Sequence, residues 1–164
     1  MGVSKRTEAK PETVSGNSGT KFPQTKQMTD TAPNKKVDII ATEICEAFTI
    51  QLRSDGILHS HTSSAIEFNV ESLKKFNLVM GKMLNYKMAP LLITLDEFAI
   101  PPVETRHFWA KKDSCPYASA DAYVAVNLGH KLIGSVYLQF NKPERPTKIF
   151  AKKEGAVEWL KTFL

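Results

Sequence analysis

Two common signatures of catalysis are missing from this chain of 164 residues. There is no Gly-x-Ser-x-Gly turn, which would present a serine nucleophile, and no glycine-rich phosphate loop. Gly129 and Gly134 lie inside a predicted helix, where close packing explains them better than phosphate binding. These absences argue against a serine hydrolase and against a P-loop nucleotide-binding enzyme.

Cysteine is also scarce. Cys45 and Cys115 are the two cysteines of the chain, they lie far apart, and they match no zinc-binding spacing. Free thiols in a reducing compartment are the expected state, with a disulfide between the two as the less favoured alternative. Cys115 has Lys111, Lys112 and Asp113 close in sequence, and this mixture of charges does not indicate an activated nucleophile.

Long apolar runs are absent as well. None approaches the roughly 18–20 residues needed to cross a bilayer, and the basic N-terminus lacks the apolar segment of a signal peptide. We therefore expect a cytoplasmic protein without a membrane span.

Positive charge is concentrated at the N-terminus. Residues 1–36 hold seven Lys or Arg against three Asp or Glu, which accounts for +4 of the total charge of +5. This segment has a single aromatic residue, Phe22, and its composition predicts a disordered basic tail, within which Met28 is an alternative start. Because residues 37–164 are nearly neutral, nucleic acid is not an expected partner.

Hydrophobic periodicity predicts one α/β domain over residues 37–164. We expect a mixed, roughly five-stranded sheet with about four helices and an opening hairpin. Asn69 and Asn127 are the expected N-caps of the first and third helices. The predicted strands are 45–53, 57–63, 90–98, 119–126 and 147–151, and the predicted helices are 69–85, 100–112, 128–140 and 156–164.

The third predicted helix carries an apolar stripe expected to face the core. Its members are Leu128, Leu132, Ile133, Val136, Tyr137 and Phe140.

The segment NKPERPTKIF, residues 141–150, has three possible roles: a binding loop, a PxxP ligand for a partner domain, or a connector. Pro143 and Pro146 stop the preceding helix, and a short β-rich run follows at once. A PxxP ligand needs a free extended segment, so we favour the connector.

Two histidines, His59 and His61, lie on one face of a predicted strand. They are close enough to share a metal ion if a third ligand came from elsewhere in the fold. No neighbouring residue in the sequence supplies that ligand, so exposed histidines on an edge strand are the favoured interpretation, and we expect neither a metal nor a cofactor.

Acidic and polar residues follow the predicted strand 90–98. Asp96 lies at its carboxyl end, which is the edge where open α/β sheets usually bind ligands. A candidate interaction rim combines it with the start of the next helix: Asp96, Glu104, Thr105, Arg106 and His107. The same residues are equally typical of a solvated first helical turn, which is the favoured interpretation.

The order of elements and the C-terminal block, with FNKPERPTKIF followed by AVEWL, resemble uncharacterised bacterial STAS-like proteins, relatives of anti-sigma-factor antagonists. The similarity covers roughly residues 44–164. It implies a mixed sheet with helices on one face, no required cofactor and a role in protein–protein regulation. In phosphorylatable antagonists a serine follows the corresponding strand, whereas this chain has Glu104, Thr105 and Arg106 there. The phosphorylation switch is therefore not implied, although Thr105 carries a hydroxyl.

The leading hypothesis is a non-enzymatic regulatory or protein-interaction domain whose partner contacts the candidate rim. An alternative is a domain that binds a small molecule or lipid in an apolar pocket between sheet and helices. A third is an enzyme built from Asp96, Glu104, Thr105 and His107. A homodimer through an exposed edge strand, such as residues 57–63, is also open.

Overall fold

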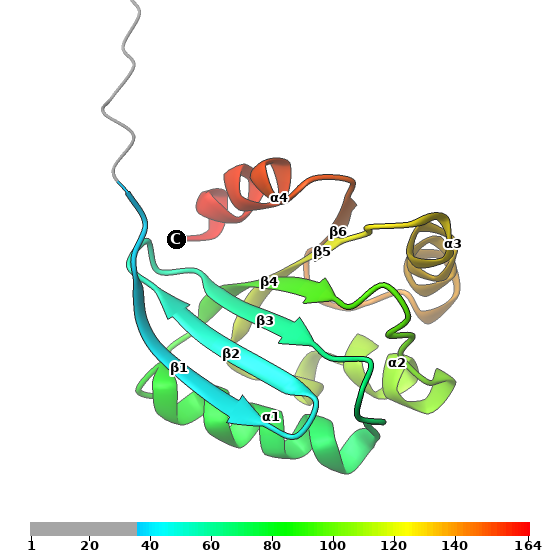
Figure 1. The fold of residues 1–164 in the computed structure, drawn as a ribbon, viewed down its shortest axis with the longest axis horizontal. Helices are drawn as coiled ribbons and strands as arrows, with labels where there is room; N and C mark the ends of the chain where they lie inside the picture. Colours follow the sequence, from blue (N-terminus) through cyan, green and yellow to red (C-terminus); the bar gives the residue numbers. More distant parts are fainter. Residues whose placement is uncertain (1–35) are drawn as a thin grey trace, which may run out of the picture. The chain divides into compact units, whose positions relative to one another are not determined.

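The computed structural model of the chain describes residues 36–164, and in this part six strands form one mixed sheet with four α-helices around it (Figure 1). The strands are β1 (Ile39–Cys45), β2 (Phe48–Arg53), β3 (Leu58–Thr62), β4 (Ala89–Leu95), β5 (Ala118–Val124) and β6 (Thr147–Phe150). The α-helices are α1 (Val70–Met83), α2 (Val103–Ala110), α3 (Leu128–Val136) and α4 (Lys153–Leu160). A π-helical turn continues α3, and 3₁₀ turns follow α2 and α4 (Tyr137–Asn141, Lys112–Ser114 and Lys161–Phe163).

The predicted fold class is confirmed: the domain is α/β, with a mixed sheet and four α-helices. The predicted tail, residues 1–36, lies outside the described residues except for Lys36. None of the helices in the described part is both long and apolar enough to cross a membrane. Cys45 and Cys115 are free, as expected from their spacing.

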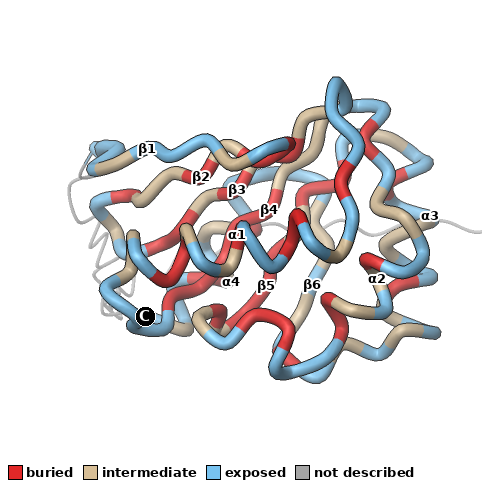
Figure 2. The backbone as a smooth tube through the Cα atoms, turned by 90° about the horizontal axis from the view of Figure 1, so that it is seen from below, coloured by how far each residue is buried: buried red, intermediate tan, exposed pale blue. Residues whose placement is uncertain are grey.

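The strand missing from the prediction is β1, at one edge of the sheet. Its side chains are mostly exposed, so it lacks the apolar alternation that identifies a half-buried strand (Figure 2). The predicted strand 45–53 is in fact interrupted: Glu46 adopts a left-handed φ of 51°, and the chain turns there from β1 into β2. This turn makes the first hairpin, and β2 and β3 make the second.

The six strands lie in sequence order across the sheet. The first three pair in antiparallel fashion, and β3 to β6 are parallel. As predicted, β4 is an interior strand. The strand predicted at 57–63 exists as β3, but its predicted position at the edge of the sheet is wrong, because it pairs with a strand on each side. The edge strands are β1 and β6.

Both predicted N-caps are confirmed. The side chain of Asn69 accepts a hydrogen bond from the Ser72 backbone N–H (3.1 Å), and Ser72 completes a capping box. The side chain of Asn127 accepts from the His130 backbone N–H (2.8 Å). These caps fix where α1 and α3 begin, and the second one places His130 in the first turn of α3.

Each face of the sheet has its own apolar core. Helices α1 and α2 pack on one face, where Phe76 and Trp109 meet strand residues such as Ile50. The opposite face is covered by α4 through Ala156 and Leu160. Parallel strands joined by right-handed crossovers place their connecting helices on one side, and the terminal helix is free to take the other.

The orientation predicted for helix α3 is wrong. Of its expected core stripe, Tyr137 is buried and Ile133 partly so, whereas the others are exposed: Leu128, Leu132, Val136 and Phe140. The inward side instead carries His130 and Gly134. A Cβ atom on Gly134 would overlap the Ile149 side chain of β6, so the expected close packing of this glycine is confirmed.

Candidate functional site

A cavity of about 100 Å³ lies between the sheet and helices α1, α2 and α3. Side chains from five of the strands and all three helices line it. Its wall is largely apolar and includes six aromatic residues: Phe48, Phe68, Phe76, Trp109, Tyr123 and Tyr137. An apolar, concave site with a few polar groups is the usual form of a small-molecule pocket.

Three polar side chains of this wall lack a hydrogen-bond partner for a buried atom. They are His130 at both ring nitrogens, Arg106 at Nε and Tyr137 at its hydroxyl, which the Tyr123 hydroxyl approaches without forming a well-directed hydrogen bond. His130 is 8% exposed and Tyr137 5% exposed. Burial also raises the pKa of Tyr137 above its ordinary value, so the phenol is neutral. Because a buried unsatisfied polar group costs roughly 1–3 kcal/mol, these three side chains need partners inside the cavity, which ordered water or a polar ligand supplies.

The predicted rim residues of α2 divide between the surface and this cavity. Thr105 is 1% exposed, and its hydroxyl donates to the Pro102 carbonyl (2.8 Å). This burial contradicts a role for Thr105 on a surface rim and closes its hydroxyl to a kinase. Arg106 also lines the cavity and donates through Nη1 to the Pro101 carbonyl (2.8 Å).

The other rim residues point elsewhere. Glu104 and His107 are exposed on α2, and the side-chain amide of Asn141 lies within hydrogen-bonding distance of His107 Nδ1 (3.0 Å). Asp96 belongs to a separate polar cluster on β3 and β4. In the described part of the chain, Asp96, Glu104, Thr105 and His107 form no hydrogen bonds with one another, so the predicted catalytic group is not assembled.

Asp96 ends a chain of side-chain hydrogen bonds across the sheet. One carboxylate oxygen contacts His61 Nε2 (2.9 Å), and the other accepts from the Ser64 N–H (2.9 Å). His61 Nδ1 contacts the Thr94 hydroxyl (3.0 Å), as does His59 Nε2 (2.9 Å). The Ser64 hydrogen bond, then that of His61, lowers the pKa of Asp96.

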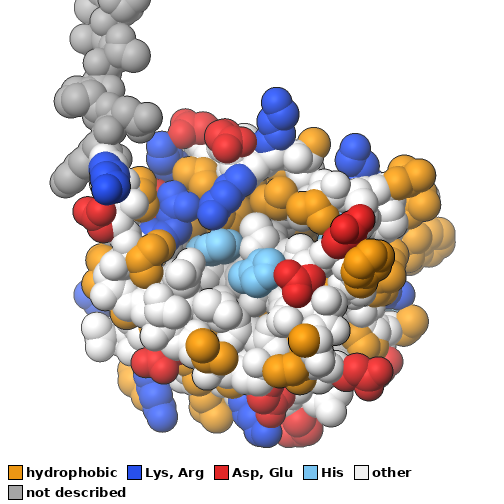
Figure 3. Space-filling view, in the orientation of Figure 1, with side chains coloured by type: hydrophobic (Ala, Val, Ile, Leu, Met, Phe, Trp, Pro, Cys, Tyr) orange, Lys and Arg blue, Asp and Glu red, His pale blue; other side chains and the backbone are white. Residues whose placement is uncertain are grey.

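The two histidines lie on the sheet face that carries α4, because the intervening Ser60 lines the cavity on the other face. Figure 3 shows two histidine side chains together on this face, with an acidic side chain beside them. They come from the interior strand β3, so their predicted position on an edge strand is wrong. No group of three or more metal-ligating side chains is found among residues 36–164.

Burial lowers the pKa of His59 to about 4, with Lys153, Arg53 and His61 adding repulsion in that order. Because this folded-state value is below the ordinary 6.5, stability is fully present above pH 6.5 and is lost as the pH falls towards 4. We expect a loss of about 1–2 kcal/mol after allowance for solvent screening. Urea unfolding of the wild type and His59→Gln at several pH values measures it.

The matched control for this prediction is His107→Gln, since His107 is an exposed histidine. His59→Gln should flatten the stability profile between pH 6.5 and 4, and His107→Gln should leave it unchanged. Equal pH profiles for the wild type and His59→Gln would contradict the assignment.

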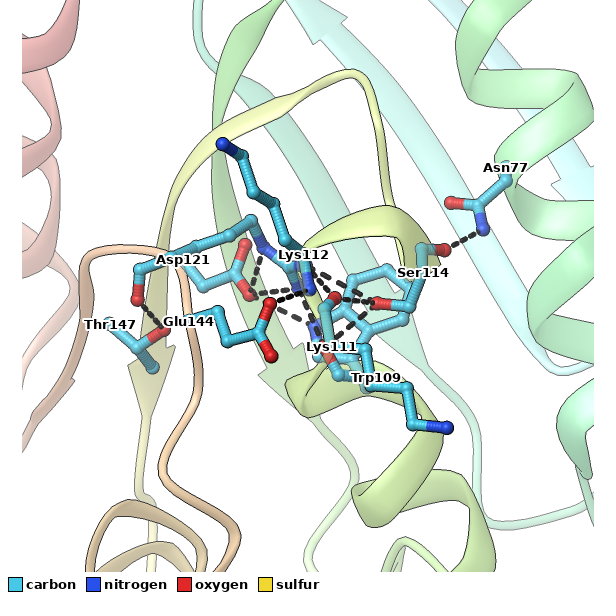
Figure 4. Close-up of polar contacts among 9 residues, drawn as sticks. Asn77, Trp109, Lys111, Lys112, Ser114, Asp121, Glu144 and Thr147 are labelled. Carbon is cyan, nitrogen blue, oxygen red and sulfur yellow. Dashed lines mark hydrogen bonds and ion pairs between the residues drawn. The ribbon is translucent and has the colours of Figure 1, made fainter.

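Within the segment 141–150, the predicted connector is confirmed: residues 142–146 link the π-helical turn after α3 to β6, and they also supply a buried cation. Arg145 donates to Asp121 Oδ2 through Nη2 (2.7 Å) and Nε (3.2 Å). Trp109 Nε1 donates to the same oxygen (2.9 Å), and Figure 4 shows Trp109, Ser114 and Asp121 converging. Burial raises the pKa of Asp121, against the opposing effect of Arg145. The pair is connected to the cavity through Trp109, whose side chain lines it and whose indole and carbonyl groups hydrogen-bond to Asp121 and Arg145.

Sequence reasoning missed the cavity, His130 and the Asp121–Arg145 pair. An aspartate in the middle of the apolar run 119–126 was the available signal, because an interior strand tolerates a charge only with a partner. The thiol of Cys115 was correctly not treated as a nucleophile: it is 1% exposed, and burial raises its pKa.

Comparison with protein families matches residues 50–164 to a domain of unknown function, DUF7793. Neither the search of curated proteins nor the search of solved structures finds a match. The matched range includes the three cavity residues with unpartnered polar atoms and the Asp121–Arg145 pair. Since it spans more than half of the sequence, the chain belongs to the DUF7793 family.

Proposed function

We propose that residues 37–164 form a non-enzymatic, STAS-like regulatory domain of the cytoplasm that binds a small molecule between its sheet and helices. The observation that carries this proposal is the set of unpartnered polar atoms of His130, Tyr137 and Arg106 in an otherwise apolar wall. Among the described residues, Asn77, Ser119 and Asp121 also have a buried atom without a partner, but none of these three lines the cavity. His130, Tyr137 and Arg106 are distinguished by sharing one apolar space, which core packing normally fills.

The size of the cavity limits the ligand. One water occupies roughly 10–15 Å³ on this measure, and an engineered apolar cavity of about 150 Å³ holds benzene. A cavity of about 100 Å³ is smaller than that, so a single ring is the upper limit of what it accepts and a long lipid chain exceeds it.

The polar atoms limit the chemistry of the ligand. Arg106 Nε carries an N–H, and His130 and Tyr137 each have a proton to donate. A carboxylate is the group that best uses several donors, especially one from a guanidinium. The proposed ligand class is thus a small aromatic or short-chain carboxylic acid.

The test is titration of the purified full chain with benzoate and with toluene, followed by NMR of the aromatic side chains. We expect benzoate to bind more tightly and to shift cavity resonances. His130→Leu should weaken benzoate binding by about tenfold, equivalent to one charge-assisted hydrogen bond, and spare toluene binding. Lys131→Met is the control, because Lys131 is the exposed neighbour on α3.

Two results would count against this function. One is the absence of any shift of cavity resonances with either compound. The other is equal benzoate affinity in the wild type and His130→Leu. Native mass spectrometry of the freshly purified protein adds an independent readout, since a retained small adduct is expected for a domain that binds such ligands.

A second candidate function is partner binding through the exposed part of α2, as the STAS-like resemblance implies. Glu104 and His107 are exposed there. A partner that uses this surface should bind Glu104→Lys at least about tenfold more weakly than the wild type. A partner whose affinity is unchanged by Glu104→Lys and by His107→Glu contacts another surface.

A further inference from the structure

Helix α3 and the turn after it are apolar on their outer side as well as on the cavity side. Four outward residues recur every fourth position and are exposed by 42–70%: Leu128, Leu132, Val136 and Phe140. Lys131 is the one charged residue in 128–140. Lys131, Ser135 and Gln139 form an exposed polar stripe beside these residues, so the helix carries apolar residues on two sides without being hydrophobic all round. An exposed apolar stripe that continues into a larger patch is typical of a surface that binds a partner.

The exposed apolar surface continues beyond α3. Phe98, Ile100 and Val103, between β4 and the start of α2, are 80%, 53% and 55% exposed. The Asn127 side chain donates to the Glu97 carbonyl (2.8 Å), which holds this segment beside the start of α3. Figure 3 shows hydrophobic side chains gathered on the side of the molecule where Figure 1 has α3. We call this set of residues, 98–103 and the outward side of 128–140, the α3 surface.

The α3 surface is large for a monomer. Phe98 and Phe140 alone expose on the order of 300 Å² of side chain. The additional leucine, isoleucine and valine side chains take it beyond the few hundred Å² of an ordinary surface patch. It approaches the roughly 800 Å² that each partner buries in a stable protein–protein interface.

The charged residues around this surface indicate what kind of partner it binds. Glu97 and Glu104 lie on the side of α2, and Lys131 and Lys142 lie on the side of α3. An anionic bilayer favours a margin of cations alone, whereas mixed signs suit a partner that presents the same mixture. Interfaces that remain permanently covered are the more apolar ones, and they are typical of homodimers.

We propose that the α3 surface covers the same surface of a second copy of this chain. A two-fold axis near Leu132 places the two α3 helices in antiparallel contact, so that each residue set meets its own copy. This proposal does not depend on ligand binding in the cavity.

The test compares the mass of the full chain in solution with that of two lysine variants by light scattering and sedimentation. The wild type should have twice the monomer mass of 18.3 kDa. Leu132→Lys should raise the dimer dissociation constant by at least about a hundredfold, because it places a cation at the centre of an apolar interface. Leu78→Lys is the control, since Leu78 is 67% exposed on α1.

Leu132→Cys in a Cys45→Ser background adds a second measurement, because Leu132 lies at the proposed two-fold axis, where the two copies of this residue come close enough for a disulfide. Under oxidation this variant should form a disulfide-linked dimer. A monomeric wild type overturns the proposal, as does a dimer that Leu132→Lys leaves intact. A dimer that dissociates with Ile44→Lys instead assigns the interface to the β1 edge, and a monomer that floats with anionic vesicles assigns the surface to a membrane.

Discussion

Replacement of Arg145 by methionine is expected to lower the free energy of unfolding by about 3–5 kcal/mol. The side chain of Asp121 is fully buried, and that of Arg145 is 5% exposed. Methionine fills similar space but removes the cation, which leaves a buried carboxyl group without its ionic partner. Arg145 also donates to the carbonyls of Trp109 and Lys111, so these acceptors lose partners too. Urea unfolding followed by circular dichroism measures the loss.

Lys152→Met is the control for this change, because Lys152 is an exposed cation at the start of α4 and its removal should alter stability little. The double variant Asp121→Asn/Arg145→Met should cost less than the sum of the two single variants, since asparagine carries no charge to leave unpaired. A loss below about 1 kcal/mol for Arg145→Met would show that the pair is not a buried ionic contact.

Local signals in the sequence predicted the elements that position the site. The β-rich apolar run from Pro90 and the N-cap residues Asn69 and Asn127 act over short distances, and the structure confirms them. Alternation failed for β1, because an edge strand with two solvated sides has no buried face to impose a period. The sequence therefore predicted the fold class correctly but predicted one strand fewer than the six of the structure.

The sequence did not reveal which side of each helix faces the core or how elements far apart in the chain pack together. The stripe of α3 looked like a core face, yet the position of its Asn127 cap and the close approach at Gly134 turn the His130 side inward. Thr105 and Arg106 are adjacent in sequence, yet Thr105 is buried and Arg106 only partly buried. The difference arises because the first turn of α2 packs over the cavity. Periodicity states which residues share a face, and tertiary contacts decide where that face points.

Substitution of Phe76 by alanine is the second prediction with a large effect, and it connects stability to the cavity. Phe76 is 2% exposed, and its ring lies 5.1 Å from that of Phe48 and 5.7 Å from that of Trp109. Truncation of a buried phenylalanine costs about 3–5 kcal/mol, through lost burial and the space left behind. Thermal unfolding should show a correspondingly lower Tm.

Because Phe76 lines the existing cavity, the space it vacates is continuous with that cavity. Phe76→Ala should therefore accept larger apolar molecules than the wild type, and naphthalene carboxylate should raise its Tm more than that of the wild type. A ligand at about 100 times its dissociation constant adds about 2.7 kcal/mol, which is enough to offset most of the loss. Leu160→Ala is the control: Leu160 is fully buried in the separate core under α4, so its truncation destabilises the fold without enlarging this cavity. If the same compound raised the Tm of both variants equally, its binding would result from general loosening of the fold. The cavity would then not be a defined binding site.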